Sequence, residues 1–199
     1  MPCRSLLCRL LICAVFGCCA TLPAPAADKA AEAPKVDPAT EAMMKAATPG
    51  AMHEKLKPLV GTWKTTVKMY SGPGEPEVSE GTSTSEWILG GRFVRETVQG
   101  TFAGMPFEGR GLTGYDNVSK EFVGVWVDNF GTGIATSVGR LDPNGKVINW
   151  QTTFNNPMPG MPNTMRSVVE FGNDKAHTFT AYAMVDGKEV KQMEITYTR

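Results

Sequence analysis

Turn-forming residues recur at nearly even spacing along most of this chain, and this regularity limits the possible folds more than any other feature. From Gly61 onward, clusters of Gly, Pro, Asn and Asp follow one another at intervals of 13 to 17 residues. The nine clusters centre near Pro73, Gly90, Gly104, Asn117, Gly131, Asn144, Pro159, Asn173 and Gly187. The intervals are rich in Thr, Val, Phe, Tyr and Trp, which favours strands of about ten residues. Nine turns therefore predict ten strands, each antiparallel to the next.

Apolar and polar side chains alternate within several of these intervals, as they do in strands with one buried face. Trp63, Val67 and Met69 share one face of their segment, and we assign that face to the interior. The same reasoning places three further groups inside, namely Val169 with Phe171, Met193 with Ile195, and Tyr197. The segment 122–127 is apolar on both faces and cannot be phased. An antiparallel meander this wide is close to the limit for an open sheet, so we expect an all-β, up-and-down closed barrel without free edges.

The first 26 residues have the three parts of a secretory signal peptide. Arg4 and Arg9 give a basic start, residues 10–17 form a short apolar core, and Ala24-Pro25-Ala26 supplies small residues for cleavage. The apolar core is shorter than the roughly 20 residues that a membrane span needs. We therefore expect an exported protein, periplasmic or extracellular. Two alternatives are a short membrane anchor and a lipoprotein anchored at Cys18, because residues 15–18 resemble a lipobox.

The five cysteines all lie inside this leader, at Cys3, Cys8, Cys13, Cys18 and Cys19. Cleavage after Ala26 would leave a mature chain without disulfides, thiolate nucleophiles or cysteine metal ligands. The whole chain has 20 basic and 20 acidic residues, and the leader removes two arginines and no acid, which leaves 18 against 20. This balance predicts no basic face, so nucleic acid is not an expected partner.

The segment 27–49 is rich in Ala, Lys, Glu and Pro and is typical of a linker. We expect it to be flexible up to Pro38 and helical across 39–47. The tripeptide 48–50 is expected to cap a second short helix with Pro49 at its first position. Met52, Leu56 and Leu59 follow at helical spacing, and this N-terminal helix is expected to close one end of the barrel domain, 50–199.

Three features suggest ligand or metal chemistry, and each has a structural alternative. Residues 109–114, Gly-Arg-Gly-Leu-Thr-Gly, match the dinucleotide-binding fingerprint, but a turn and a strand follow where a helix is required. We expect these glycines to allow strand coiling or the close approach of a neighbouring side chain. The methionine-rich segment 158–165 contains soft Cu(I) ligands, and is alternatively a loop over the barrel mouth. His177 is a candidate axial haem ligand or a capping residue. We assign no cofactor and no metal site.

Polar and aromatic residues near the strand-rich centre are the remaining candidates. The charged ones are Glu86, Arg95, Glu96, Glu108, Arg110 and Asp128. An interior Glu–Arg pair could orient a ligand or perform acid–base work, but we expect each of these side chains to face solvent. The candidate ligand-binding residues are Trp63, Trp87, Phe93, Arg95, Tyr115, Trp126, Trp150 and Phe154. No catalytic residues are assigned.

Four segments together carry a family resemblance. They are residues 59–63 (LVGTW), 87–93 (WILGGRF), 109–116 (GRGLTGYD) and 191–199 (KQMEITYTR). The sequence resembles the bacterial domain-of-unknown-function family fifteen seventy-nine, DUF1579. The resemblance implies a calycin-like barrel, similar to lipocalins and fatty-acid-binding proteins. It transfers no functional residues, because the family has no established activity.

Our leading functional hypothesis is an exported protein that binds a small apolar or amphipathic ligand in the barrel. A barrel of this strand number leaves room beyond its own side chains. The alternatives are an enzyme that uses interior Glu and Arg side chains, a metal or haem carrier, and a ligand-free structural envelope protein. The sequence favours a non-enzymatic role, since no catalytic constellation stands out.

Overall fold

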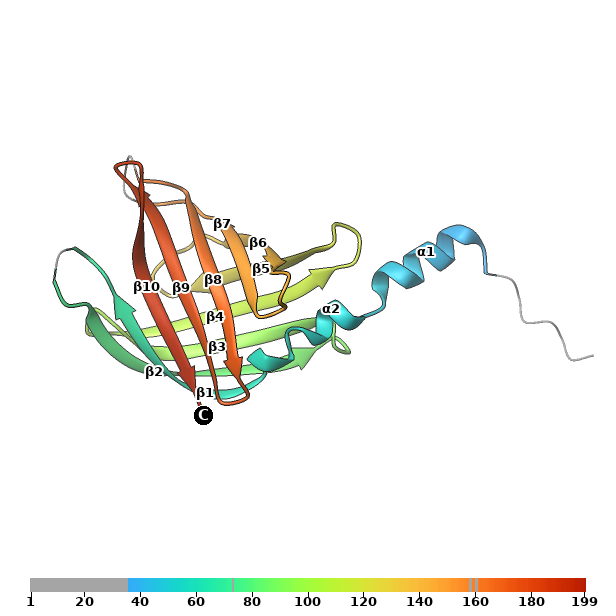
Figure 1. Ribbon diagram of the computed structural model, residues 1–199, viewed down its shortest axis with the longest axis horizontal. Helices are drawn as coiled ribbons and strands as arrows, with labels where there is room; N and C mark the ends of the chain where they lie inside the picture. The colour runs from blue at the N-terminus through green and yellow to red at the C-terminus, as the bar shows by residue number, and fades with distance from the viewer. Residues whose placement is uncertain (1–35, 73, 158, 160) are drawn as a thin grey trace, which may run out of the picture. The chain divides into compact units, whose positions relative to one another are not determined.

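The structure is a computed structural model that describes residues 36–72, 74–157, 159 and 161–199. The predicted signal peptide 1–26 and the first part of the predicted linker, like Pro73, Met158 and Gly160, lie outside the described residues. The elements, shown in Figure 1, are α1 (Pro38–Ala47), α2 (Ala51–Glu54), the 3-10 helix η1 (Lys57–Leu59), β1 (Gly61–Met69), β2 (Glu77–Ile88), β3 (Phe93–Phe102), β4 (Met105–Asp116), β5 (Glu121–Asp128), β6 (Ala135–Leu141), β7 (Val147–Thr153), β8 (Thr164–Asn173), β9 (Ala176–Val185) and β10 (Lys188–Thr198). None of the described helices is both long and apolar enough to span a membrane.

The ten strands form one closed antiparallel barrel, as the spacing of the turns predicted. Each strand pairs with the strand before and after it in the chain, and β1 closes the barrel by pairing with β10. The register of that closing pair runs from Lys64 opposite Thr198 to Met69 opposite Met193. Because the sheet is closed, neither terminal strand presents an unpaired edge to solvent.

The predicted turns coincide with the connections between strands. Gly90, Gly104 and Gly187 each have φ between 65° and 75°, a backbone conformation that glycine adopts without strain. In the turn between β6 and β7, Asp142 Oδ1 accepts hydrogen bonds from the backbone N–H groups of Lys146 and Val147, both at 2.7 Å. The predicted turn residue Asn173 is the last residue of β8, and the turn itself follows it.

The two N-terminal helices differ from each other in how well the sequence predicted them. Helix α1 forms where expected, and Asp37 caps it by accepting from the backbone N–H of Ala39 and Thr40. The second helix begins two residues later than predicted, at Ala51 rather than Pro49, with Gly50 as its N-cap. It is also broken: α2 ends at Glu54, and a separate 3-10 turn follows over 57–59. Pro58 explains the break, because it has no N–H to donate within a continuous helix.

This N-terminal segment closes one end of the barrel. Leu56, between α2 and η1, is completely buried and packs in a cluster with Val94, Phe122, Ile148 and Trp150. The cluster belongs to the barrel end formed by the last residues of β2, β4, β6 and β8 and the first residues of β3, β5 and β7. The opposite end, bounded by the connections after β1, β3, β5, β7 and β9, has no such plug among the described residues.

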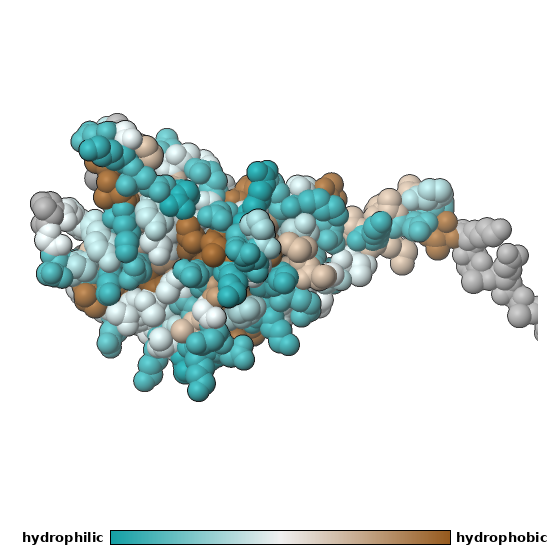
Figure 2. Space-filling model, viewed as in Figure 1, coloured by the Kyte–Doolittle hydropathy of each residue, from teal (hydrophilic) through white to brown (hydrophobic). Residues whose placement is uncertain are grey.

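The outer face of the barrel carries most of the charge, and the face seen in Figure 2 is mainly hydrophilic with small separate apolar patches. Ion pairs join neighbouring or nearby strands on this surface. Glu121 accepts from Arg140 at 2.6 Å, and Arg166 pairs with Glu189 through two hydrogen bonds of 2.6 and 2.8 Å. Because these pairs are solvent-exposed, we expect each to contribute little to stability, roughly 0–1 kcal/mol.

Candidate functional site

The interior of the barrel is hollow and contains two adjoining chambers. The inner chamber has a volume of about 300 Å³ and lies toward the closed end, where Leu59 lines it. The mouth chamber has a volume of about 290 Å³ and lies toward the opposite end. Four residues, Trp126, Met193, Ile195 and Tyr197, line both chambers and mark the junction between them. A volume near 300 Å³ is at the lower end of the range for small-molecule sites.

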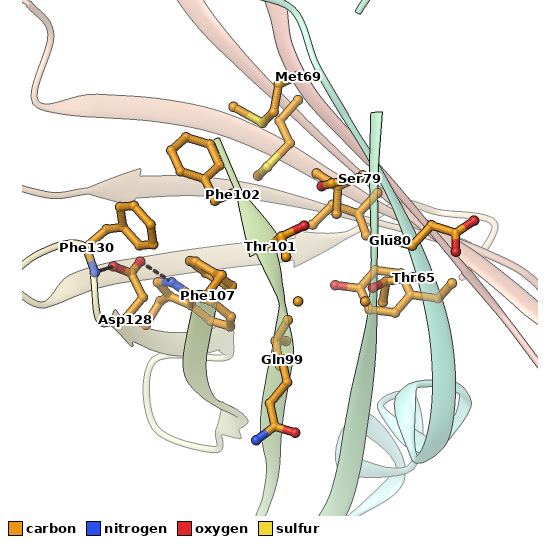
Figure 3. A pocket seen from close by; sticks show the side chains of 18 residues that line it. Thr65, Met69, Ser79, Glu80, Gln99, Thr101, Phe102, Phe107, Asp128 and Phe130 are labelled. Atoms are coloured by element: carbon orange, nitrogen blue, oxygen red, sulfur yellow. Dashed lines mark hydrogen bonds between the residues drawn. The ribbon is translucent and has the colours of Figure 1, made fainter. Parts of the chain in front are cut away.

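Aromatic side chains dominate one wall of the mouth chamber. In Figure 3 the rings of Phe102, Phe107 and Phe130 gather on one side, and Thr65 and Ser79 lie on the other. The Phe102 and Phe130 rings meet edge to face with centroids 5.1 Å apart. These two phenylalanines are also partly exposed, at 39% and 42% of their surface, so the apolar wall continues to the rim of the barrel.

Trp126 forms a flat wall between the two chambers. Its indole lies against β4 at Gly109 and Gly111, where an added Cβ would stand 2.2 and 3.2 Å from ring carbons. Its Nε1 donates to Asp128 Oδ2 at 2.9 Å, and the other oxygen of Asp128 accepts from the Phe130 backbone N–H at 2.9 Å (Figure 3). Gly109 and Gly111 therefore let one face of the Trp126 indole pack against the β4 backbone, and the Asp128 carboxylate holds the ring there. The exposed part of the ring lines the chambers.

A half-buried acid, Glu96, lines the inner chamber next to Tyr197 at the junction. Ser83 Oγ donates to Glu96 Oε1 at 2.7 Å, and the Tyr197 hydroxyl is the second hydrogen-bond partner of this carboxyl. Burial raises the pKa of Glu96 above its usual value, although both hydrogen bonds act in the opposite direction. Burial, with the neighbouring Glu96 charge, raises the pKa of Tyr197 well above its usual value. What surface Glu96 retains faces the inner chamber, so the carboxyl is sheltered from bulk solvent yet accessible to a ligand.

Two unpaired polar atoms belong to residues that neighbour Tyr197. His177 is 5% exposed and lines the inner chamber; its ring stacks on Tyr197 at 4.2 Å and meets Trp63 edge-on at 4.5 Å. Burial, and secondarily the positive charge of Arg199, lowers the pKa of His177 to about 4, so the imidazole is neutral at pH 7. Among the described buried side chains, only His177 Nδ1 and Thr65 Oγ1 lack a hydrogen-bond partner. Unpaired buried polar atoms are uncommon and often mark a place where a ligand or water binds.

The candidate ligand-binding residues from the sequence fall into three groups. Trp126 and Trp150 line the chambers. Trp87 and Tyr115 pack at the closed end, where Tyr115 contacts His53 and Phe122. The remaining four do not line either chamber. Trp63 is packed against His177 and Arg199, Phe93 covers Gly114, Arg95 pairs with Glu86 on the exposed surface, and Phe154 follows β7, where its backbone N–H donates to Asn163 O.

The charged candidates from the sequence also divide between the outer surface and the interior of the barrel. Glu86 pairs with Arg95, and Glu108 with Arg110, in exposed ion pairs. Glu96 contradicts our expectation, because it faces the interior, and its partners are Ser83 and Tyr197 rather than an arginine. The alternation of β3 contained the signal: Glu96 has the same parity as Val94, which is buried in the core. We expected it outside because charged side chains commonly project into solvent.

The other motifs behave as structural elements. In the 109–114 segment, Gly109 and Gly111 admit the ring of Trp126, and Gly114 lies under Phe93, which confirms the expected close approach of side chains. Within the methionine-rich segment, Met165 lines the inner chamber and Met161 is 43% exposed, while Met158 lies outside the described residues. Across the described part of the chain, no three His, Cys, Asp or Glu side chains gather into a group that could hold a metal ion.

Comparison with known proteins identifies the family. A model of the family described as "Protein of unknown function (DUF1579)" matches residues 48–199. This chain belongs to the DUF1579 family. No curated protein matches this DUF1579 member closely enough to assign a relationship.

Two solved structures share the fold of this DUF1579 protein. Rv2717c from M. tuberculosis aligns with a TM-score of 0.57 at 14% identity, over 76% of this chain and 99% of that chain. The S-type phycobiliprotein lyase CPES from Guillardia theta aligns with a TM-score of 0.51 at 9% identity, over 79% of this chain and 96% of that chain. Both are calycin-like barrels, and at this identity the likeness shows the fold alone.

Proposed function

We propose that this protein binds a small amphipathic ligand inside the barrel, with its polar group at the Glu96–Tyr197 pair and its apolar part along Trp126 and the chamber walls. The observation that carries the proposal is the hollow interior, in which mostly apolar walls surround a few convergent polar groups. Sites of this composition are typical of small-molecule binding proteins. The two chambers also favour this role over a barrel filled by its own side chains.

The polar groups that line the chambers can form hydrogen bonds with an uncharged polar group of a ligand. A carboxyl with a raised pKa can both donate and accept a hydrogen bond in its neutral form. Thr65 Oγ1 and His177 Nδ1 lie beside the same tyrosine and have no partner among the described residues. A ligand hydroxyl or amine at the junction would give such atoms a partner, and the cost of leaving each buried group unpaired, about 1–3 kcal/mol, would be removed.

A blocking substitution tests the proposal. Thr113 lines the inner chamber, so Thr113→Phe would place a phenyl ring where the ligand is proposed to lie. Thr84→Phe adds the same ring at an exposed position of β2 and is the matched control. Titration calorimetry with decan-1-ol should show binding to the parent protein and the control, and at least about tenfold weaker binding to Thr113→Phe. Equal binding to all three would show that the alcohol does not use the interior.

The cellular setting is part of the same proposal. The basic start, apolar core and small residues of 1–26 support export, so the ligand would be met in the periplasm or outside the cell. Fractionation of cells producing the full chain, with mass spectrometry of the intact product, tests this. Export predicts a product that begins at residue 27, or at a lipid-modified Cys18. A cytoplasmic product that still begins at Met1 would contradict it.

A further inference from the structure

The charges around the two chambers restrict the class of ligand. Across the described residues, no lysine or arginine lines either chamber. The acids are Glu96 at the junction, Asp128 in the mouth chamber, and Glu80, which is exposed and points away from the chamber in Figure 3. A negatively charged ligand would therefore enter a low-dielectric space that offers acidic groups and no cation.

The arginines nearest the barrel are engaged elsewhere. Arg95, Arg110, Arg140 and Arg166 each pair with a glutamate on the outer surface. Arg199, whose charge acts on His177, lies over Trp63 at 4.1 Å and donates to the carbonyl oxygens of Val60 and Asp174. Moving any of these groups inward would break its pair and bury its charge, which is costly. His177 cannot replace them, since it is neutral at pH 7.

We propose that the barrel accepts amphiphiles whose polar group is an alcohol or an amine and excludes those that carry a carboxylate. This inference rests on the proposed ligand-binding function. An alcohol can exchange hydrogen bonds with Glu96, Tyr197 or Thr65. An ammonium group would pair with an ionised Glu96 and lie near the aromatic faces of Trp126 and Tyr197, where cations bind favourably. A carboxylate would find no cation to pair with and would remain a buried charge without a counter-ion, near the acidic Glu96.

The residues around Glu96 indicate that Glu96 itself is the group that would favour an ammonium ligand over a carboxylate. The groups around it are Ser83 on β2, Tyr197 on β10 and, behind the tyrosine, His177 on β9, whose nearest charge is Arg199. Gly111 on β4 contributes no side chain. Asp128, the other interior acid, lies in the mouth chamber and already accepts from Trp126 Nε1 and the Phe130 backbone N–H. Glu96 is therefore the group that can supply a negative charge to an ammonium ligand beside Tyr197.

Three probes with the same ten-carbon chain test which polar group the barrel accepts. They are decan-1-ol, decylamine and sodium decanoate, each titrated into the protein at pH 8. We expect the alcohol and the amine to bind, and decanoate to bind at least about a hundredfold more weakly than the alcohol, because its charge is uncompensated. At pH 5 much of the decanoate is the neutral acid, and its affinity should rise toward that of the alcohol. The affinity of the alcohol should be nearly unchanged between the two pH values.

Glu96→Gln and Glu86→Gln complete the test. Glu96→Gln should weaken decylamine binding at least about tenfold and leave decan-1-ol within about threefold of the parent. Glu86→Gln, on the outer surface, should change neither, and urea unfolding should confirm that both variants are folded. Decanoate binding as tightly as decan-1-ol at pH 8 would overturn the inference and leave the proposed function standing. Binding of none of the three probes would overturn both.

Discussion

Glu96 and Tyr197 face each other inside the barrel from strands β3 and β10, and the hydrogen bond between their side chains links the protonation of the two groups. Burial is the main cause for both residues, and the Glu96 charge further raises the pKa of Tyr197. The two residues are 101 positions apart in the chain, and the closure of the barrel brings them together across β2 and β1. The proposed ligand contacts depend on this pair of side chains.

Glu96 should make the stability of the protein depend on pH. Its pKa in the folded state is raised above the value in the unfolded chain. The group therefore contributes most below its unfolded pKa, and that contribution is lost as pH rises through the folded pKa. Glu96→Gln keeps the shape and the hydrogen bonds but does not ionise. We expect it to match the parent at pH 4 and to be more stable at pH 8, by an amount on the order of 1 kcal/mol.

Urea unfolding at pH 4, 6 and 8 measures this difference. Glu86→Gln, on the exposed surface beside Arg95, is the control and should not gain stability at pH 8. A Glu96→Gln variant that is destabilised equally at every pH would show that the carboxyl is not a buried acid with a raised pKa.

His177 should have the opposite pH dependence. Burial, then the charge of Arg199, lowers its pKa from 6.5 to about 4. Its contribution to stability is therefore present above pH 6.5 and is lost as pH falls toward 4, a change of about 3 kcal/mol. His177→Phe retains a flat ring against Tyr197 and cannot take up a proton. The free energy of unfolding of the variant should fall less between pH 7 and pH 4 than that of the parent. Parallel profiles for the two proteins would rule out His177 as the cause.

Gly109 should be intolerant of a side chain because Trp126 occupies its space. An alanine Cβ at Gly109 would stand 2.2 Å from the indole, so the ring must move. We expect Gly109→Ala to cost about 1–3 kcal/mol of stability and to alter tryptophan fluorescence. Gly133→Ala is the matched control, since nothing lies within 4 Å of its added Cβ. Unchanged fluorescence and stability in Gly109→Ala would contradict the placement of Trp126.

Leu56 should be the main contact that closes the inner end of the barrel. It is fully buried in the cluster with Val94, Phe122 and Ile148. Leu56→Ala removes this plug and should destabilise the protein by about 2–5 kcal/mol in urea unfolding. Met43→Ala in α1, at a residue that is 72% exposed, should change stability by less than about 0.5 kcal/mol. Comparable losses in both variants would mean that Leu56 is not a specific packing contact.

The number and order of strands followed from local sequence, because turn residues and period-two alternation act over a few positions. Tyr197, Ile195 and Met193 were assigned to the interior on alternation alone, and they line the chambers. The strand 122–127 could not be phased because both faces are apolar; in the structure Phe122 is buried, while Val125 and Val127 are 42% and 40% exposed.

The site was harder to predict because it depends on non-local pairing. No local pattern around Glu96 points to Ser83 or Tyr197 as its partners, and we expected an outward position because charged side chains on strands commonly project into solvent. Trp126 lines the chambers because Gly109 and Gly111 lie opposite it on the neighbouring strand, a relation set by the β4–β5 register. Phe93 and Arg95 were also candidates for the interior, but they have the opposite parity to Val94 and Glu96 on β3, which places them on the outer face.

A crystal structure of this protein grown with decan-1-ol would show directly whether the barrel binds an amphipathic ligand in its interior. We predict that the alkyl chain lies inside the barrel against Trp126, with the hydroxyl within hydrogen-bond distance of Glu96 or Tyr197. Chambers that remain empty of the alcohol at a saturating concentration, or an alcohol bound only on the outer surface, would contradict it.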